Sequence, residues 1–448
     1  MNTAIGLLVR FFERWVPDSL VIAVCLTLLT FVLAITVSGM APLAAVDLWG
    51  DSFWTLLSFT NQIALTLLFG YALASAAIVR RLLLRIAGHV RSARMAYAIV
   101  SVVTGVLALL SWSLALVAAG ILSRAVGEAC KRRGVRVHYP LLVASAFSGF
   151  VVWHQGLSGS IPLTLATPGH FLESQVGIIA TSQTLFSRWS LITALLVIVS
   201  LPWVMGRLHP GSDDAIREAP DHPLGEPEST QQVTDADASA DAPASKLERS
   251  RLLAGTVVAL GLLALVRYFA GDGPGLTLNS VNFTLLMLGI LCAGSLRTYA
   301  QNVVAGGGIA VPFLLQYPFY AGIAGLIAGS GLAGSIVGLF TTIADTGSLP
   351  VLGFFSAGIL NIFIPSGGAQ WAVQGPIMMG AAQQLGADLP LVAMSVALGD
   401  QWTNLVHPLI LLPVLTVAGI AARAVIGYSL IAMLWSGLIF VAALLLAA

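Results

Sequence analysis

Long apolar runs separated by short polar or basic stretches make up most of this chain. A helix needs about 20 mostly apolar residues to cross the hydrocarbon core of a bilayer. Uninterrupted runs of about this length lie at residues 18–38, 55–79, 187–206, 251–270, 278–296, 309–329 and 427–447. We therefore expect an all-α polytopic membrane protein.

Two further apolar segments, 139–168 and 389–422, are interrupted by polar residues in a similar order. The interruptions read HQGLSGSIPL at 154–163 and DQWTNLVHPL at 400–409, so Gln, Pro and Leu recur in register. Paired interruptions in the two halves of a membrane protein indicate the substrate site of a transporter. We predict that both helices break there and direct their polar groups at one shared cavity.

Segments 95–130 and 349–385 are predicted to be re-entrant hairpins. Each contains two apolar runs of about 15 residues, which is short for a crossing. A polar or Pro/Gly tip joins the two runs, at 111–113 in the first segment and at 364–370 in the second. A hairpin that enters and leaves on one side is tolerated where protein or water covers its exposed backbone.

The order span, span, hairpin, broken span, span occurs twice, which predicts an internal repeat. One such unit crosses the membrane an even number of times, so the extra span within 251–277 inverts the second copy. We divide the chain into an N-terminal repeat at 1–206, a flexible cytoplasmic linker at 207–250, this inverting span, and a C-terminal inverted repeat at 278–448.

Composition supports a membrane protein and narrows its partners. The chain is 57% hydrophobic and 9% charged, with a mean hydropathy of +0.92, whereas soluble domains carry about 25% charged residues. The net charge of +1 argues against a nucleic-acid partner. Cys25, Cys130 and Cys292 have no metal-binding or disulfide spacing.

The basic residues predict the orientation. With a cytoplasmic N-terminus, only Arg188 and Arg267 of the 21 basic residues fall near the outer face, a strong positive-inside bias. This orientation places the first hairpin on the cytoplasmic side and the second on the outer side. Residues 4–16 are predicted to form an amphipathic interfacial helix and not a cleavable signal peptide.

Asp400 is the only carboxylate predicted near the middle of the membrane. A charge there costs about 2.5–3.5 kcal/mol even on lenient scales, so it usually serves a function. Asp400 could carry a proton, help to bind Na⁺ together with Asn404, or only cap the unwound stretch. His154 occupies the matching place in the first repeat, and His407 follows Asp400; each is either a proton carrier or a structural donor.

The second halves of the interrupted elements are expected to begin just after Ser113, Ser160, Gly368 and His407. Helix N-termini present free N–H groups, which suit an anionic ligand. Because neither Arg nor Lys is expected at this depth, the anion should be small and singly charged, such as a monocarboxylate.

One tryptophan lies at or beside each break: Trp112, Trp153, Trp371 and Trp402. These indoles either wall an apolar pocket for a short acyl chain or support irregular backbone. Gln62 and Gln316 lie at comparable places in the two repeats; they either face the moving part or make polar contacts between helices, and we favour the contacts.

Several runs give the chain a resemblance to the bacterial short-chain fatty acid transporter family, within the ion-transporter superfamily. They are RWVPD at 14–18, WGDSFW at 49–54, SGSIPL at 158–163, ATPG at 166–169, VN at 281–282, PFYAGI at 318–323, PSGG at 365–368 and VQGP at 373–376. The best-known member of this family imports acetoacetate and butyrate.

The resemblance implies a homodimer in the bacterial cytoplasmic (inner) membrane, with a scaffold domain and an elevator-type transport domain. It also implies site positions, namely Ser158, Gly159, Ser160, Ser366, Gly367, Gly368 and Asn404. This chain departs from the family pattern at His154 and Gln155, where small residues are expected. It also departs at Asp400, where Glu is expected, and at His407, where Gln is expected.

We therefore predict a symporter that imports short-chain fatty acids, with no cofactor beyond a coupling H⁺ or Na⁺. The substrate-binding prediction comprises Ser113, Ser158, Gly159, Ser160, Ser366, Gly367, Gly368, Asn404, Trp112 and Trp402. The ion-coupling prediction comprises Asp400, His154, His407, Gln155, Gln401 and Thr403. The alternatives are a transporter of another small organic acid, a passive channel, and an intramembrane hydrolase using Ser158 or Ser366.

Overall fold

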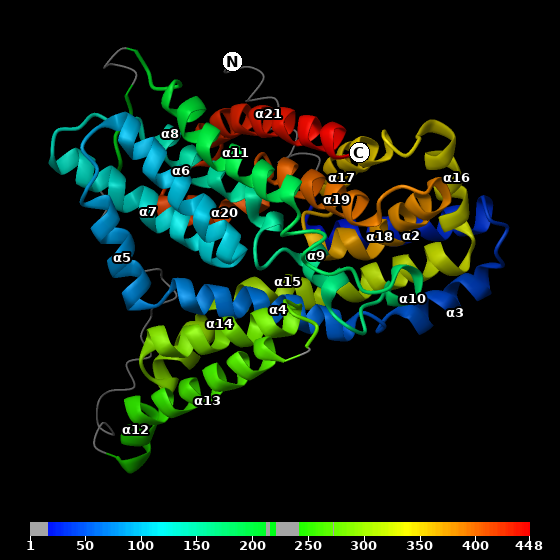
Figure 1. The fold of residues 1–448 in the computed structure, drawn as a ribbon, viewed down its shortest axis with the longest axis horizontal. Helices are drawn as coiled ribbons and strands as arrows, with labels where there is room; N and C mark the ends of the chain where they lie inside the picture. The colour runs from blue at the N-terminus through cyan, green and yellow to red at the C-terminus, as the bar shows by residue number, and fades with distance from the viewer. Residues whose placement is uncertain (1–16, 212–215, 221–241, 272) are drawn as a thin grey trace.

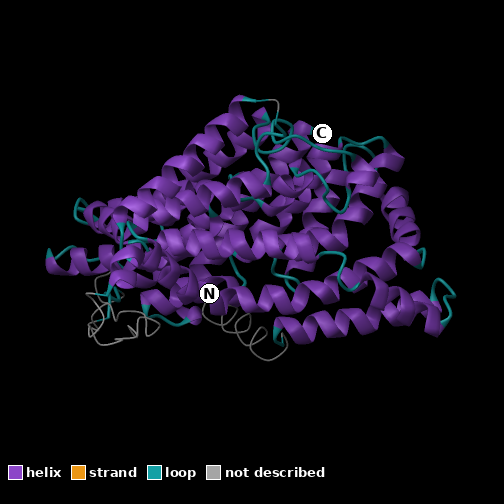
Figure 2. Ribbon diagram, turned by 90° about the horizontal axis from the view of Figure 1, so that it is seen from below, coloured by secondary structure: helices purple, strands orange, loops and turns teal. Residues whose placement is uncertain are grey.

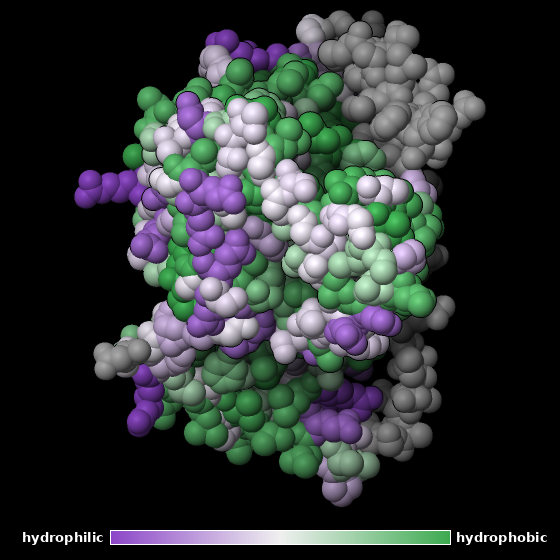
Figure 3. Space-filling view, turned by 90° about the vertical axis from the view of Figure 1, so that its right-hand side faces the viewer, coloured by the Kyte–Doolittle hydropathy of each residue, from purple (hydrophilic) through white to green (hydrophobic). Residues whose placement is uncertain are grey.

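The computed structural model describes residues 17–211, 216–220, 242–271 and 273–448, which form helices and loops and no strand (Figure 2). Within these residues, nine helices are long and apolar enough to cross a membrane, or ten if one bent pair counts as a span. On the face drawn in Figure 3, hydrophobic residues cover broad areas. The predicted interfacial helix at 4–16 lies outside the described residues.

One set of packed helices, which we call the long-helix group, contains the longest helix of the described chain. Its members are α2 (Ser19–Thr36), α3 (Pro42–Ser52), α4 (Leu57–Ala74), α13 (Arg251–Ala270), α14 (Leu278–Ala293) and α15 (Leu296–Gly329). Polar side chains join them: Gln62 Nε2 donates to Asn279 Oδ1 at 3.0 Å, and Gln316 Nε2 to Ser19 Oγ at 2.6 Å. The interpretation of Gln62 and Gln316 as contacts between helices is confirmed.

A second set of packed helices, which we call the broken-helix group, contains both predicted breaks and both predicted hairpin segments (Figure 1). Its members are α6 (Ala93–Leu110), α7 (Trp112–Arg132), α8 (Tyr139–Ser148), η1 (Gly149–Gln155), α9 (Ser160–Ala166), α11 (Arg188–Gly206), α17 (Leu349–Asn361), α18 (Gly367–Leu385), α19 (Leu389–Asn404), α20 (Pro408–Ala418) and α21 (Ala422–Ala447).

Short helices complete the fold. They are α5 (Ala77–Ala87), α10 (Glu173–Val176), α12 (Pro243–Glu248) and α16 (Leu332–Ile343). Helix α5 follows α4 and packs on α7, and α16 follows α15 and packs on α18. The two therefore hold matching places, each between a long span and the second helix of a predicted hairpin.

Both predicted helix breaks are present. In the first, α8 passes into the 3₁₀ helix η1, which ends at Gln155, and α9 starts at Ser160. In the second, α19 continues to Asn404 and α20 starts at Pro408, with a bend of 48° between them. The polar interruption begins at Asp400, but the helix ends one turn later, at Asn404. Asp400 itself is therefore helical.

The hairpin segments differ in length from the sequence prediction. Helices α6 and α7 have 18 and 21 residues and meet at Ser111, and each alone is long enough to cross. The prediction of two runs of about 15 residues in the first hairpin segment was therefore wrong. Both helices are longer, because Ser111 is the only residue that separates them. In the second segment α17 has only 13 residues, and residues 362–366 separate it from the 19-residue α18.

Three other boundaries correct the sequence prediction. Helix α15 has 34 residues and begins at Leu296, well before the predicted start at 309, because Gln301, Asn302 and the three glycines at 306–308 interrupt the apolar pattern without ending the helix. The predicted span 55–79 ends at Ala74, and α5 begins as a separate helix. Helix α3 was missed, because its apolar run is short and contains Asp47 and Asp51.

Replacing Gly399 by alanine should destabilise the fold. A Cβ at Gly399 would overlap the Phe354 carbonyl oxygen of α17 and lie 2.8 Å from the Ala357 Cβ, and overpacking of this kind costs about 1–3 kcal/mol. We expect a lower midpoint in thermal unfolding of the detergent-solubilised protein. Gly338→Ala is the control, since nothing lies within 4 Å of a Cβ there; equal midpoints for both variants would contradict the packing.

Candidate functional site

The two broken helices meet through a buried pair of ionisable side chains, Asp400 on α19 and His154 on η1. The Asp400 Oδ2 atom lies 3.1 Å from His154 Nε2, and both side chains are fully buried. Asn404 Nδ2 donates to the same carboxylate oxygen at 3.3 Å. The other oxygen, Oδ1, has no hydrogen-bond partner in the described part of the chain.

Two glutamines hold the breaks together around this pair. Gln401 Oε1 accepts from the backbone N–H of His154 at 2.8 Å, and Gln401 Nε2 donates to Gln155 Oε1 at 3.3 Å. Gln155 Nε2 in turn donates to the Ser190 carbonyl at 2.8 Å. The repeated Gln therefore joins the two interruptions directly.

The tip of the second hairpin segment reaches the same centre. Helix α18 begins at Gly367, where a Cβ would overlap His154 Nε2 and lie 2.9 Å from Ser160 Oγ. Ser160 Oγ is buried and has no hydrogen-bond partner among residues 17–211, 216–220, 242–271 and 273–448. The centre thus combines two imperfectly satisfied oxygens with the N-terminal turn of a 19-residue helix.

Asn361, at the end of α17, is a site residue that sequence reasoning missed. Its Nδ2 lies 3.0 Å from the Asp400 carbonyl oxygen, 2.9 Å from Thr403 Oγ1 and 2.8 Å from Asn404 Oδ1. The side chain is fully buried. Asn361 follows an apolar stretch and belongs to no motif. The one feature of the sequence that could have indicated it is an amide side chain in an apolar run close to the predicted hairpin tip.

Tyr317 on α15 was also missed, and it links the hairpin tip to the long-helix group. Its hydroxyl lies 3.2 Å from Ser366 Oγ, and a Cβ at Gly368 would lie 2.5 Å from the same hydroxyl oxygen. Ser366 and Gly368 therefore contact Tyr317 of α15, on either side of Gly367, which reaches the Asp400–His154 centre.

The tip of the first hairpin segment likewise contacts the long-helix group, at α4. Ser158 Oγ accepts from the backbone N–H of Trp112 at 2.9 Å. Ser113 Oγ lies 3.4 Å from the Thr66 carbonyl oxygen, and a Cβ at Gly70 would overlap Ser113 Oγ. Ser113 and Ser158 are therefore occupied by contacts between elements.

The four tryptophans divide into two kinds. The Trp112 and Trp153 rings lie 6.0 Å apart, and Trp153 stacks on His154 with 3.6 Å between ring centroids. Trp371 is fully buried in the core of α18. The Trp402 indole donates to the Met433 carbonyl of α21 at 2.7 Å and packs on Phe354 of α17.

Three other predicted residues lie beside the centre. His407 Nε2 lies 3.3 Å from the Ile362 carbonyl oxygen, so this ring contacts the second hairpin segment. Thr403 Oγ1 donates to the Gly358 carbonyl at 3.0 Å. Gly159 allows the close approach of the His154 carbonyl, which a Cβ would overlap.

Helix breaks enclosed between packed helices, with polar groups gathered in the interior, define a multi-pass membrane transporter. The sequence profile of the family described as "Short chain fatty acid transporter" matches residues 2–447. The chain belongs to this family, and it is a transporter and not an enzyme. The hydrolase alternative is thereby overturned.

Two curated relatives carry the provisional name of short-chain fatty acid transporter. A protein of Escherichia coli (strain K12) is 38% identical over 438 residues, covering 98% of each chain. A protein of Haemophilus influenzae (strain ATCC 51907 / DSM 11121 / KW20 / Rd) is 35% identical over 439 residues, covering 96% of each chain.

The fold is also that of solved transporters with little sequence similarity. The YdaH transporter of Alcanivorax borkumensis superposes with a TM-score of 0.62 at 17% identity, over 96% of this chain and 98% of the other. MtrF of Neisseria gonorrhoeae, described within a class of antimetabolite efflux pumps, gives 0.59 at 13% identity, over 99% and 97%.

Replacing Asn361 by alanine should destabilise the protein, because it removes the amide donor that three buried oxygens share. An unsatisfied buried polar group costs about 1–3 kcal/mol. We expect a lower thermal unfolding midpoint than in the control Asn302→Ala, whose side chain makes one weaker contact, 3.4 Å to the Ala72 carbonyl. A midpoint equal to that of the control would show that the Asn361 contacts are energetically unimportant.

Proposed function

We propose that this protein is a secondary-active transporter that imports short-chain monocarboxylates together with a proton, by alternating access. The observation that carries this proposal is the buried Asp400–His154 pair, which lies where both helix breaks and one hairpin tip converge. An ionisable pair inside a membrane protein is costly and usually marks an ion pathway.

The geometry favours a proton over Na⁺ as the coupling ion. A separation of 3.1 Å between Asp400 Oδ2 and His154 Nε2 fits one shared hydrogen bond, and Asp400 Oδ1 remains available for a second proton position. The oxygens of Thr403 and Asn404 that could have bound Na⁺ already face the Asn361 amide.

The substrate carboxylate would contact Ser160 Oγ, His154 and the first turn of α18. These groups are packed together in the described conformation, since a Cβ at Gly367 would overlap His154 Nε2, so the carboxylate enters only when they separate. Free N–H groups at a helix N-terminus stabilise an anion without a full countercharge. Neither Lys nor Arg contacts Asp400 or His154 within the described part of the chain, which favours a monocarboxylate over a polyanion. Trp112 and Trp153 supply an apolar surface for a short acyl tail.

The substrate class is drawn from the family, whose relatives are named for short-chain fatty acids. The runner-up is another small organic acid bound in the same way. Because MtrF is described among efflux pumps, the direction of transport must be measured and not assumed from the fold.

We also propose two inverted repeats that work as an elevator within a homodimer of the inner membrane. The matching placement of α5 on α7 and of α16 on α18 supports the repeat. Both hairpin tips contact the long-helix group, Ser113 at α4 and Ser366 at Tyr317 of α15. The long-helix group would be the scaffold and the broken-helix group the moving part.

Uptake of labelled butyrate into proteoliposomes with an imposed pH gradient tests the function. We expect saturable accumulation that requires an inward proton gradient and is indifferent to Na⁺. Asp400→Asn should lose at least about tenfold in gradient-driven accumulation, because its amide cannot exchange a proton. Asp388→Asn is the control, since that exposed carboxylate only caps α19.

Undiminished proton-driven accumulation by Asp400→Asn would remove the coupling assignment. Equilibration without accumulation would favour a channel, and accumulation driven by Na⁺ alone would replace the proton.

A disulfide between α4 and α7 tests the elevator motion. A Cβ at Gly70 would lie 3.3 Å from the Ser113 Cβ, near the usual range for a disulfide. In a background lacking Cys25, Cys130 and Cys292, oxidation of Gly70→Cys/Ser113→Cys should stop uptake, and a reductant should restore it. The two single variants are controls, and wild-type uptake by the cross-linked protein would exclude motion at this contact.

A further inference from the structure

Helix α5, the turn after it and the first turn of α6 carry a cluster of basic side chains. Residues 77–94 contain five arginines and neither Asp nor Glu. The arginines are Arg80, Arg81, Arg85, Arg91 and Arg94, and all five are exposed. Within the described residues, no carboxylate forms an ion pair with any of them.

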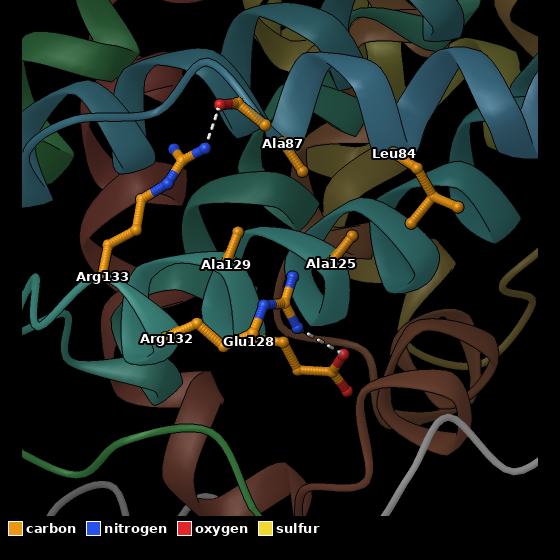
Figure 4. Close-up of a pocket in the computed structure, with 8 residues that line it drawn as sticks. Leu84, Ala87, Ala125, Glu128, Ala129, Arg132 and Arg133 are labelled. Carbon is orange, nitrogen blue, oxygen red and sulfur yellow. Dashed lines mark hydrogen bonds and ion pairs between the residues drawn. The ribbon is translucent and has the colours of Figure 1, made fainter.

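The opposite side of α5 is fixed against the protein. Leu83 and Ala87 are 2% exposed and belong to the core that includes α7. At the end of the helix, Arg133, which follows the last residue of α7, donates to the Gly88 carbonyl at 2.6 Å and to the Val90 carbonyl at 2.8 Å. Figure 4 shows this close approach of α5 and α7. The arginines of α5 therefore face outward in a defined orientation.

Exposed apolar side chains run beside the arginines. Ile78 and Leu82 lie one turn apart and are 51% and 56% exposed, and Arg81 and Arg85 lie one turn apart on the adjacent strip of the helix. A helix with neighbouring apolar and basic strips suits the boundary between lipid tails and headgroups. A helix in contact with water alone would gain nothing from exposing both leucine and isoleucine.

Helix α16 provides an internal comparison. It holds the matching place on α18, has 12 residues, and contains no charged residue. Helices α5 and α16 lie at opposite ends of the molecule (Figure 1). The basic charge is therefore not needed for this kind of helix to pack, and of the two helices only α5 carries it.

We infer that α5 is a docking surface for the headgroups of anionic phospholipids. Clusters of several Lys or Arg next to a membrane span attract anionic lipids, and the attraction adds up over the residues. Since α5 connects α4 to α6 and is held by α7, the bound lipids would hold this connection between the two helix groups at the membrane surface.

Thermal unfolding and native mass spectrometry of the full chain in a neutral detergent test the inference. Phosphatidylglycerol should raise the unfolding midpoint more than phosphatidylcholine does. The triple variant Arg80→Gln/Arg81→Gln/Arg85→Gln should bind phosphatidylglycerol roughly a hundredfold more weakly and lose most of that rise. Replacing the same arginines by Lys should keep it, because the charge remains.

The control for net charge is Arg188→Gln/Arg267→Gln/Arg423→Gln, which removes three exposed arginines elsewhere and should keep the full response. An undiminished response in the α5 glutamine variant would overturn the inference, as would an equal response to phosphatidylcholine. An equal response to inorganic phosphate would also overturn it, since it would show a free-anion site. If the triple variant fails to fold, two double variants replace it. The response to phosphatidylglycerol is then compared between Arg81→Gln/Arg85→Gln and the control Arg188→Gln/Arg267→Gln.

Discussion

The need to satisfy unwound backbone inside a membrane is the constraint on which this structure depends. Lipid offers no hydrogen bonds, so each freed backbone group requires a partner within the protein. The partners come from the other interrupted elements: Leu157 N–H donates to the Leu109 carbonyl at 2.7 Å, and Ser158 accepts from the Trp112 N–H. Gln401 accepts from the His154 N–H, and Asn361 donates to the Asp400 carbonyl. Each break is therefore stable only beside its neighbours.

Glycine makes these contacts short enough. A Cβ at Gly156 would lie 2.6 Å from Leu109 Cα, and one at Gly367 would overlap His154. Side chains at these places would separate the first break from α6 and the second hairpin tip from the centre. Glycine weakens a helix because it has no side chain. For the same reason it lets backbone segments approach closely, and the site depends on that approach.

Charge is used sparingly and at separate places. Within the described residues, the interior holds one close carboxylate–imidazole pair, Asp400 and His154, which suits a small anion and a single proton. The surface at α5 carries arginines that nothing in the described protein neutralises, whereas α16 carries none. The interior pair serves the proposed coupling, and the basic end meets the lipid surface.

The sequence by itself determined the membrane class, most spans and both helix breaks, because hydropathy and polar interruptions are local properties. It also placed Asp400, His154, Gln155 and Gln401 in one site, since their matching order required both breaks to face each other. Tertiary structure alone decided the roles of Asn361 and Tyr317, and it turned Trp402 toward α21. The roles of these residues depend on which face of a helix packs against which neighbouring helix. Most helices in this chain are apolar on nearly every face, so the hydrophobic periodicity of the sequence does not predict that packing.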